Sequence, residues 1–148
     1  NTMLPRDVSD LLPQKSPFKM VDLLHEATET FTRTSFTILS DNVMVDAGLL
    51  TEGGMIENMA QSAAAGSGYF FSMAAHDTHS ETNSSKEIPI GYIGAVKNVS
   101  ILKQPAVGNE ISTELLSKHK IGQASIVDAK IFFQKELLGS CELTIFVQ

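Results

Sequence analysis

Apolar and polar side chains alternate along the C-terminal half of the chain, and a period of two residues is typical of a half-buried β-strand. One face of the segment 125–133 carries Val127, Ala129 and Ile131, while Asp128 and Lys130 lie on the other face. The final segment repeats this alternation, with Cys141, Leu143, Ile145 and Val147 inward, and turn residues separate the segments. The pattern predicts four strands joined largely by hairpins, at residues 90–102, 110–118, 125–133 and in the last segment.

Two further strands are predicted in the N-terminal half. The segment 18–24 reads FKMVDLL, and the segment 27–39 is dense in β-branched residues, so we expect two neighbouring strands that pair with each other. Before them, residues 7–12 predict only a short helical turn, because Pro13 pushes its predecessor out of the α region. Residues 40–50 show no clean period and predict a loop.

The segment 52–75 follows a helical period instead. Met55, Met59 and Ala63 recur at four-residue steps, and Thr51 is placed to cap the helix. The middle of this segment is rich in alanine and glycine, so another surface can lie close to its backbone. Helix and sheet must bury each other, which predicts one α+β domain over residues 1–148, with an antiparallel sheet of about six strands curled around one long helix.

One carboxylate interrupts this apolar helix. Glu57 is the one acidic or basic side chain between residues 53 and 75, and Gln61 stands one turn further along the same stripe. Buried carboxylates are costly unless they are paired or protonated. Two interpretations therefore stay open: Glu57 faces solvent or a partner, or it is held in a site for chemistry.

Composition narrows the function classes. The 148 residues carry a net charge of −6 with Lys and Arg scattered, which argues against a nucleic-acid surface. The single cysteine, Cys141, excludes an intrachain disulfide, and its apolar neighbours favour a small core residue over a nucleophile. No apolar run is long enough for a membrane span and no signal peptide is recognised, so we expect a cytoplasmic protein. No metal-ligand spacing occurs, and we expect neither metal nor cofactor.

Four segments, in order, resemble one known family. They read LLPQKSPFKMVD at 11–22, IENMAQ at 56–61, GYIGAVKN at 91–98 and KQPAVGN at 103–109. These are similar to the motifs of the hotdog-fold 3-hydroxyacyl-acyl-carrier-protein dehydratases of fatty-acid synthesis, and the likeness extends over nearly the whole chain. The resemblance implies the hotdog fold and a homodimer whose sheets join edge to edge, with acyl tunnels along the interface. Further assembly into a hexamer, as a trimer of dimers, is left open.

The resemblance also implies roles for residues. In the family, the carboxylate that matches Glu57 acts with a histidine from the other subunit: the histidine removes the α proton and the carboxyl group handles the departing hydroxyl. Gln61 would orient groups near the glutamate. The strand residues Gly91, Ile93, Gly94 and Ala95 would help bind the thioester of an acyl carrier protein or coenzyme A.

The chain departs from the family in the loop before the helix. The dehydratases carry their histidine there, whereas this chain has no histidine between His25 and His76. Asn42 or Val43 occupies the expected place, and Asn42 and Asp46 are the candidates for a second group. A closer resemblance is to a divergent branch found beside aryl polyene and related lipid pathways, which has a changed pre-helix loop.

Three functions remain as hypotheses. The first is a dehydratase acting on 3-hydroxyacyl chains, with Glu57 as acid or base and an unidentified second group. The second is a thioesterase that uses Glu57 alone, with Gly53 and Gly54 allowing a thioester to approach the helix N-terminus. The third is a noncatalytic subunit that binds acyl chains or stabilises a complex.

Overall fold

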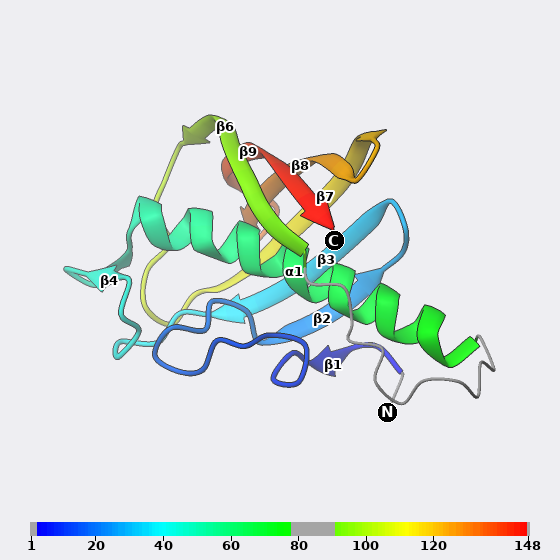
Figure 1. The fold of residues 1–148 in the computed structure, drawn as a ribbon. Helices are drawn as coiled ribbons and strands as arrows, with labels where there is room; N and C mark the ends of the chain where they lie inside the picture. The colour runs from blue at the N-terminus through cyan, green and yellow to red at the C-terminus, as the bar shows by residue number, and fades with distance from the viewer. Residues whose placement is uncertain (1–2, 78–90, 148) are drawn as a thin grey trace.

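The computed structural model describes residues 3–77 and 91–147 of the chain. In this part of the chain a single helix, α1 (Glu52–Asp77), lies across one large sheet (Figure 1). No helix among the described residues is long and apolar enough to cross a membrane. The strands, in chain order, are β1 (Arg6–Asp7), β2 (Leu23–Ala27), β3 (Phe31–Thr37), β4 (Val45–Asp46), β5 (Leu49–Leu50), β6 (Gly91–Ile101), β7 (Glu110–Ile121), β8 (Ala124–Phe133) and β9 (Glu136–Val147).

The large sheet has seven strands in the order β1-β2-β3-β7-β8-β9-β6, and every neighbouring pair is antiparallel. It curls around α1, as Figure 1 shows. The predicted α+β arrangement is confirmed. The sheet has one strand more than the expected six or so, because the two-residue β1 pairs with β2.

The four C-terminal strands lie where the alternation predicts them. On three of them the inward positions are buried: Ile111, Thr113 and Leu115 on β7, Val127, Ala129 and Ile131 on β8, and Cys141, Leu143 and Ile145 on β9, whereas on the edge strand β6 Val99 is exposed. The polar partners at alternate positions point to the opposite face. A half-buried sheet therefore follows directly from the two-residue period.

The predicted strand at 18–24 is wrong in its position. The strand β2 begins only at Leu23, although β2 and β3 do pair with each other as expected. Met20 is buried, but its backbone N–H and C=O are bonded to side chains of α1 instead of a neighbouring strand. With both ladder groups used in this way, the segment 18–20 packs on the helix, and the backbone joins the sheet only from Asp22, whose N–H donates to the Ser35 carbonyl of β3.

The helix begins where the sequence predicts. The Thr51 hydroxyl accepts a hydrogen bond from the Gly54 N–H at 3.1 Å, which satisfies one of the free donors of the first turn. The predicted loop at 40–50 contains a small hairpin, because Ala47 and Gly48 adopt positive φ angles and allow β4 and β5 to pair. The polar loop predicted after the helix, residues 76–87, lies almost entirely outside the described residues.

Two apolar clusters fix α1 between the sheet and the N-terminal segment. Met55, Met59 and Ala63 belong to the larger cluster, which fills the space between the helix and β3, β7, β8 and β9. Ala65 belongs to the smaller cluster, which packs under the N-terminal segment with Val8 and Val21. The sheet and the N-terminal segment thus cover two sides of the helix. A third side, which includes Glu57, is only partly covered.

At Gly66 the helix backbone lies close to a side chain of β3. A Cβ built on this residue would lie 2.3 Å from the Thr32 hydroxyl oxygen of β3 and 2.8 Å from its methyl carbon. Gly68 lies only two residues further along, yet a Cβ there would meet its nearest neighbour, the Leu11 carbonyl oxygen, at an ordinary 3.5 Å. Only the first of these two glycines is required by packing.

This difference predicts opposite effects for one substitution. Gly66→Ala should lower the free energy of unfolding by about 1–3 kcal/mol through overpacking against Thr32. Gly68→Ala should raise it by up to about 1 kcal/mol, because alanine is the better helix former. Urea unfolding of both variants beside the parent chain measures the two effects, and Thr32→Ala should rescue Gly66→Ala. Equal stabilities for the two variants would contradict the close approach at Gly66.

Candidate functional site

Glu57 and Gln61 form the centre of the candidate site. They lie one turn apart on α1, and the Gln61 Nε2 donates a hydrogen bond to the Glu57 Oε2 at 3.0 Å. Gln61 is 3 % exposed, whereas Glu57 is half-buried. No ion pair involves Glu57 among the described residues, so its carboxylate is held by an amide and remains partly open to solvent. Gln61 thus contacts Glu57 directly, and its role in orienting groups near the glutamate stays a prediction.

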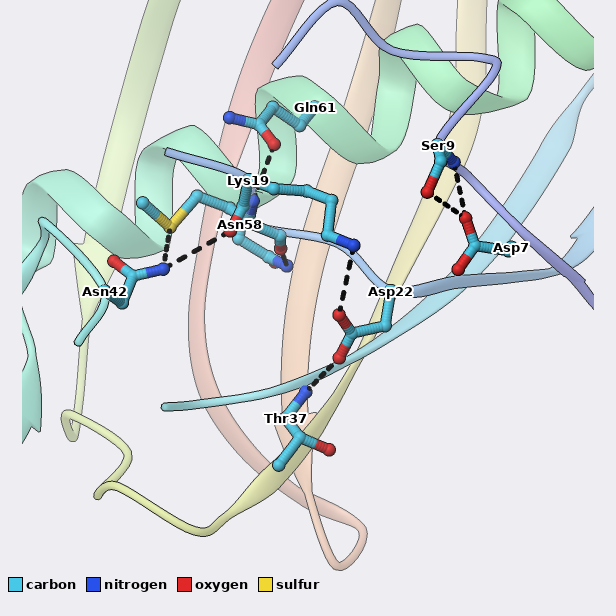
Figure 2. A network of polar contacts seen from close by, with 9 residues as sticks. Asp7, Ser9, Lys19, Asp22, Thr37, Asn42, Asn58 and Gln61 are labelled. Carbon is cyan, nitrogen blue, oxygen red and sulfur yellow. Dashed lines mark hydrogen bonds and ion pairs between the residues drawn. The ribbon is translucent and has the colours of Figure 1, made fainter. Parts of the chain in front are cut away.

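The side chains of Asn58 and Gln61 hold the backbone of Met20 from one face of the helix. The Met20 N–H donates to the Gln61 Oε1 at 2.7 Å, and the Asn58 Nδ2 donates to the Met20 carbonyl oxygen at 2.7 Å. Gln61 Nε2 also donates to the Phe18 carbonyl oxygen at 3.1 Å. Residues three apart on a helix are neighbours, so these two amides replace a strand partner for the segment 18–20. Figure 2 shows both amides beside this segment.

Asn42 holds the same segment from the other side. Its Nδ2 lies 3.3 Å from the Lys19 carbonyl oxygen and 3.3 Å from the Met20 sulfur, as Figure 2 shows. Its Oδ1 accepts from the Met44 N–H at 2.8 Å. Asn42 is 8 % exposed. Both ends of its amide are therefore engaged in fixing the pre-helix loop against the segment 18–20.

Asp46 and the two helix-start glycines lie apart from this network. Asp46 is exposed on β4 and makes no side-chain hydrogen bond or ion pair with the described residues. Gly54 is buried, its N–H is taken by Thr51, and a Cβ on it would lie within 2.5 Å of Leu50. Packing thus requires Gly54, and of the two glycines only Gly53 is exposed.

The predicted thioester-binding strand is β6, which forms one edge of the sheet. Ile93 packs against the main core, and Ala95 is half-buried. Gly94 sits at a register shift, and the Phe146 ring occupies the space of a Cβ on it, 2.1 Å away. Gly91 pairs with Val147. The strand contacts α1.

The histidines that the structure describes do not join Glu57. His25 on β2 bonds through Nε2 to the Ser35 hydroxyl at 2.7 Å, and burial together with Arg33 lowers its pKa. His119 is exposed on β7. The His76 side chain and the whole of His79 lie outside the described residues. No group of three potential metal ligands occurs in the described part of the chain.

A cavity of about 130 Å³ lies on the opposite, sheet-facing side of the helix. Ala63, Gly66 and Phe70 of α1 line it, together with residues of β3, β7 and β8. Neither Glu57 nor Gln61 contributes to its wall. A molecule bound at the Glu57 carboxylate would therefore lie on a different face of α1 from this cavity.

Sequence reasoning did not identify Asn58, Met20 and Thr113 as part of the site. Thr113 of β7 donates a short hydrogen bond to the Asn58 Oδ1, so these residues link the sheet to the helix and the N-terminal segment. The one signal in the sequence is Asn58 itself, a second polar amide in a mostly apolar helix, three positions before Gln61. The group that Asn58 bonds to, the Met20 backbone carbonyl, has no signature in sequence.

Comparison with protein-family models identifies the chain. The model of the ApeP-like family, described as ApeP dehydratase, matches residues 6–148. The chain belongs to the ApeP-like family. This is a divergent branch of the hotdog-fold dehydratases, as the motifs at 11–22 and 56–61 and the missing histidine indicated. No curated protein sequence matches the chain significantly.

Solved structures share the fold of this ApeP-like chain. The dehydratase heterocomplex ApeI:P from Xenorhabdus doucetiae contains a chain with a TM-score of 0.78 and 15 % identity, covering 99 % of this chain and 92 % of that one. A protein of Streptococcus mutans bound to acetyl-CoA has a TM-score of 0.67 and 14 % identity, with 93 % and 95 % covered. A hypothetical thioesterase from Streptococcus pneumoniae with coenzyme A has a TM-score of 0.64 and 10 % identity, with 84 % of each chain covered. At these identities the likeness shows the hotdog fold alone.

Cys141 lies in the core, as the sequence predicts, and burial raises the pKa of its thiol to about 11. Because the thiolate is the reactive form, a rise of about two pH units leaves about a hundredfold less thiolate at pH 8. The native protein should therefore react with iodoacetamide far more slowly than a free thiol, and at a normal rate after unfolding in urea. Mass analysis of the alkylated chain measures both rates. Rapid labelling of the folded protein would contradict the assignment of Cys141 to the core.

Proposed function

We propose that this chain is a subunit of a dehydratase that removes water from 3-hydroxyacyl thioesters, and that Glu57 protonates the departing hydroxyl group. The observation that carries the proposal is the Glu57 carboxyl group, half-buried on α1 and held through Oε2 by Gln61. Membership of the ApeP-like family supports the reaction class. A carboxyl group in this position can transfer a proton because one oxygen is fixed and the other is available.

The reaction needs two groups on opposite sides of one carbon–carbon bond. A base removes a proton from the carbon next to the thioester carbonyl, and the electron pair forms the new double bond. The bond from the β-carbon to the hydroxyl oxygen breaks, and Glu57 gives its proton to that oxygen, which leaves as water. Glu57 then recovers its proton from the base or from solvent for the next turnover.

The orientation of Gln61 determines which oxygen of Glu57 carries the proton. Gln61 Nε2 can only donate, and it faces Oε2, so Oε2 acts as the acceptor in both protonation states. The transferable proton is therefore carried on Oε1. This is the oxygen that the substrate hydroxyl must approach.

The base comes from a second hotdog chain in this proposal. The described histidines do not reach Glu57, and Asn42 has both ends of its amide engaged. The ApeI:P structure is named as a dehydratase heterocomplex, which supports a complex in which one chain supplies the carboxyl group and another the histidine. Asp46 remains the candidate for the base within this chain. A homodimer of this chain remains the alternative to a complex of two different hotdog chains.

The substrate in this proposal is an acyl group held on acyl carrier protein, or on coenzyme A, with β6 residues 91–95 beside the thioester. A thioesterase is the alternative, because hydrolysis can proceed with Glu57 as its only protein acid or base. Two solved hotdog proteins, one with coenzyme A and one bound to acetyl-CoA, support this alternative. A noncatalytic subunit would bind the same thioester without changing it.

Mass spectrometry of a 3-hydroxyacyl group on acyl carrier protein separates these functions. We expect the loss of one water when this chain is mixed with a hotdog subunit that carries the family histidine, and little loss with either chain alone. Turnover by this chain alone would mean that the base is Asp46 or a residue outside the described part of the chain. Release of the free acid would identify a thioesterase, and an unchanged substrate in every mixture would contradict the proposed reaction.

Replacement of Glu57 tests the role of its carboxyl group. Glu57→Gln should lower kcat of the complex by about a thousandfold, the scale of general acid catalysis. The variant should unfold at the parent temperature or slightly above it, because it removes a half-buried charge. Glu52→Gln is the matched control, since it makes the same change at an exposed position of the same helix. Full activity in Glu57→Gln would overturn the assignment.

A further inference from the structure

Asn58 does not bond to Glu57, yet it belongs to a chain of hydrogen bonds that ends on Glu57. Thr113 of β7 donates to the Asn58 Oδ1, and the Asn58 Nδ2 donates to the Met20 carbonyl at 2.7 Å. The Met20 N–H then donates to the Gln61 Oε1, whose Nε2 donates to Glu57. Asn58 and Thr113 are both 0 % exposed, so these bonds form away from solvent.

Each amide in this chain has one permitted orientation. Asn58 must turn its oxygen to the Thr113 hydroxyl and its nitrogen to the Met20 carbonyl, because the reverse would set Oδ1 against the Met20 carbonyl oxygen, and neither oxygen can donate. Gln61 must turn Oε1 to the Met20 N–H, which leaves Nε2 facing Phe18 and Glu57. A reversed Gln61 would set its oxygen against the oxygens of Phe18 and Glu57.

The charged groups around this chain point elsewhere. Lys19, in the segment packed on the helix, has its ammonium 3.8 Å from the Asp22 Oδ1, and Figure 2 shows this side chain directed to Asp22. Glu114 and Arg33 lie on the outer face of the sheet, because each is one position away from the inward-facing Thr113 and Thr34. The orientation of Gln61 is thus set by the hydrogen bonds and not by a neighbouring ion.

We propose that Asn58 and Thr113 are positioning residues for the Glu57 carboxyl group: they fix the Met20 backbone, which fixes the Gln61 amide, which holds Oε2. This inference rests on the proposed function for its catalytic meaning, while the positioning itself is a property of the protein without substrate. Thr113 lies on β7, 55 positions from Asn58 in the chain, and acts on Glu57 through three intermediate residues.

The test uses four single variants of the full chain. Thr113→Val keeps the shape of the side chain and removes the donor to Asn58, whereas Thr113→Ser keeps the hydroxyl, and Asn58→Ala removes the amide itself. Ser62→Ala is the matched control: it removes another buried hydrogen bond between α1 and the sheet, the 2.7 Å contact with Thr34, which shares no hydrogen bond with Gln61. All four should remain folded, and thermal unfolding verifies this for each sample.

The readout is the solvent exchange of the Gln61 side-chain amide protons, followed by nitrogen-15 NMR in the protein without substrate. Gln61 Nε2 donates to the Phe18 carbonyl oxygen and to the Glu57 Oε2, so release of the Gln61 amide should speed this exchange by about tenfold. We expect the faster exchange in Thr113→Val and in Asn58→Ala, and the parent rate in Thr113→Ser and Ser62→Ala. An unchanged rate in folded Thr113→Val, or an equal increase in Ser62→Ala, would overturn the inference.

Kinetics of the same variants distinguish this inference from the proposed function. In Thr113→Val we expect kcat to fall roughly tenfold with little change in KM, and Thr113→Ser should keep the parent kcat. A dehydratase with an unchanged Gln61 exchange rate in Thr113→Val would refute the positioning role and leave the function intact. Faster Gln61 exchange in Thr113→Val of a protein that dehydrates nothing would support positioning and refute the function.

Discussion

The structure depends on how the backbone of Met20 is satisfied. Met20 is buried beside the helix, and a buried N–H and C=O must both find partners. The side chains of Gln61 and Asn58 provide them, in place of a neighbouring strand. This arrangement fixes the N-terminal segment on α1, sets where β2 begins, and leaves the Gln61 nitrogen free to hold Glu57.

The helix meets two demands that ordinarily conflict. It must be apolar and small enough to lie against the sheet, which Met55, Met59 and Gly66 achieve through burial and close approach. It must also present a carboxylate that stays half-open. The conflict is resolved by placing Glu57 on a strip that faces neither the main sheet contact nor the small apolar cluster, with a buried amide one turn away to hold it.

The departure from the family's histidine has a structural counterpart. Asn42, near the expected place of that histidine, ties the pre-helix loop to Lys19 and Met20 through both ends of its amide. The same loop contains a short hairpin that turns at Ala47 and Gly48. The loop therefore holds the segment whose Met20 N–H bonds to Gln61. This structural use of Asn42 fits the proposed site, in which this chain provides the acid and another chain the base.

Much of the fold could be predicted from sequence because its signals are local. The helical period over 52–75 and the alternation after residue 125 each need only a few neighbouring residues, and the helix and the C-terminal strands lie where these patterns place them. The segment 18–24 could not be placed correctly, because its backbone partners are side chains some 40 positions away. Glu57 and Gln61 were recognisable from the motif at 56–61. The contact between Asn58 and Thr113 could not be predicted, because it depends on how the helix is positioned against β7.

The most direct measurement is solvent exchange of the side-chain amide protons of Gln61 and Asn58, followed by nitrogen-15 NMR, with the exposed Gln123 as an internal reference. The hydrogen bonds of the two buried amides should make the Gln61 and Asn58 amide protons exchange at least tenfold more slowly than those of Gln123. The Gln61 signal should also move in Glu57→Ala, which removes the acceptor of its Nε2. Exchange at the rate of Gln123, with a Gln61 signal unchanged in Glu57→Ala, would contradict the hydrogen bond that holds the Glu57 carboxylate.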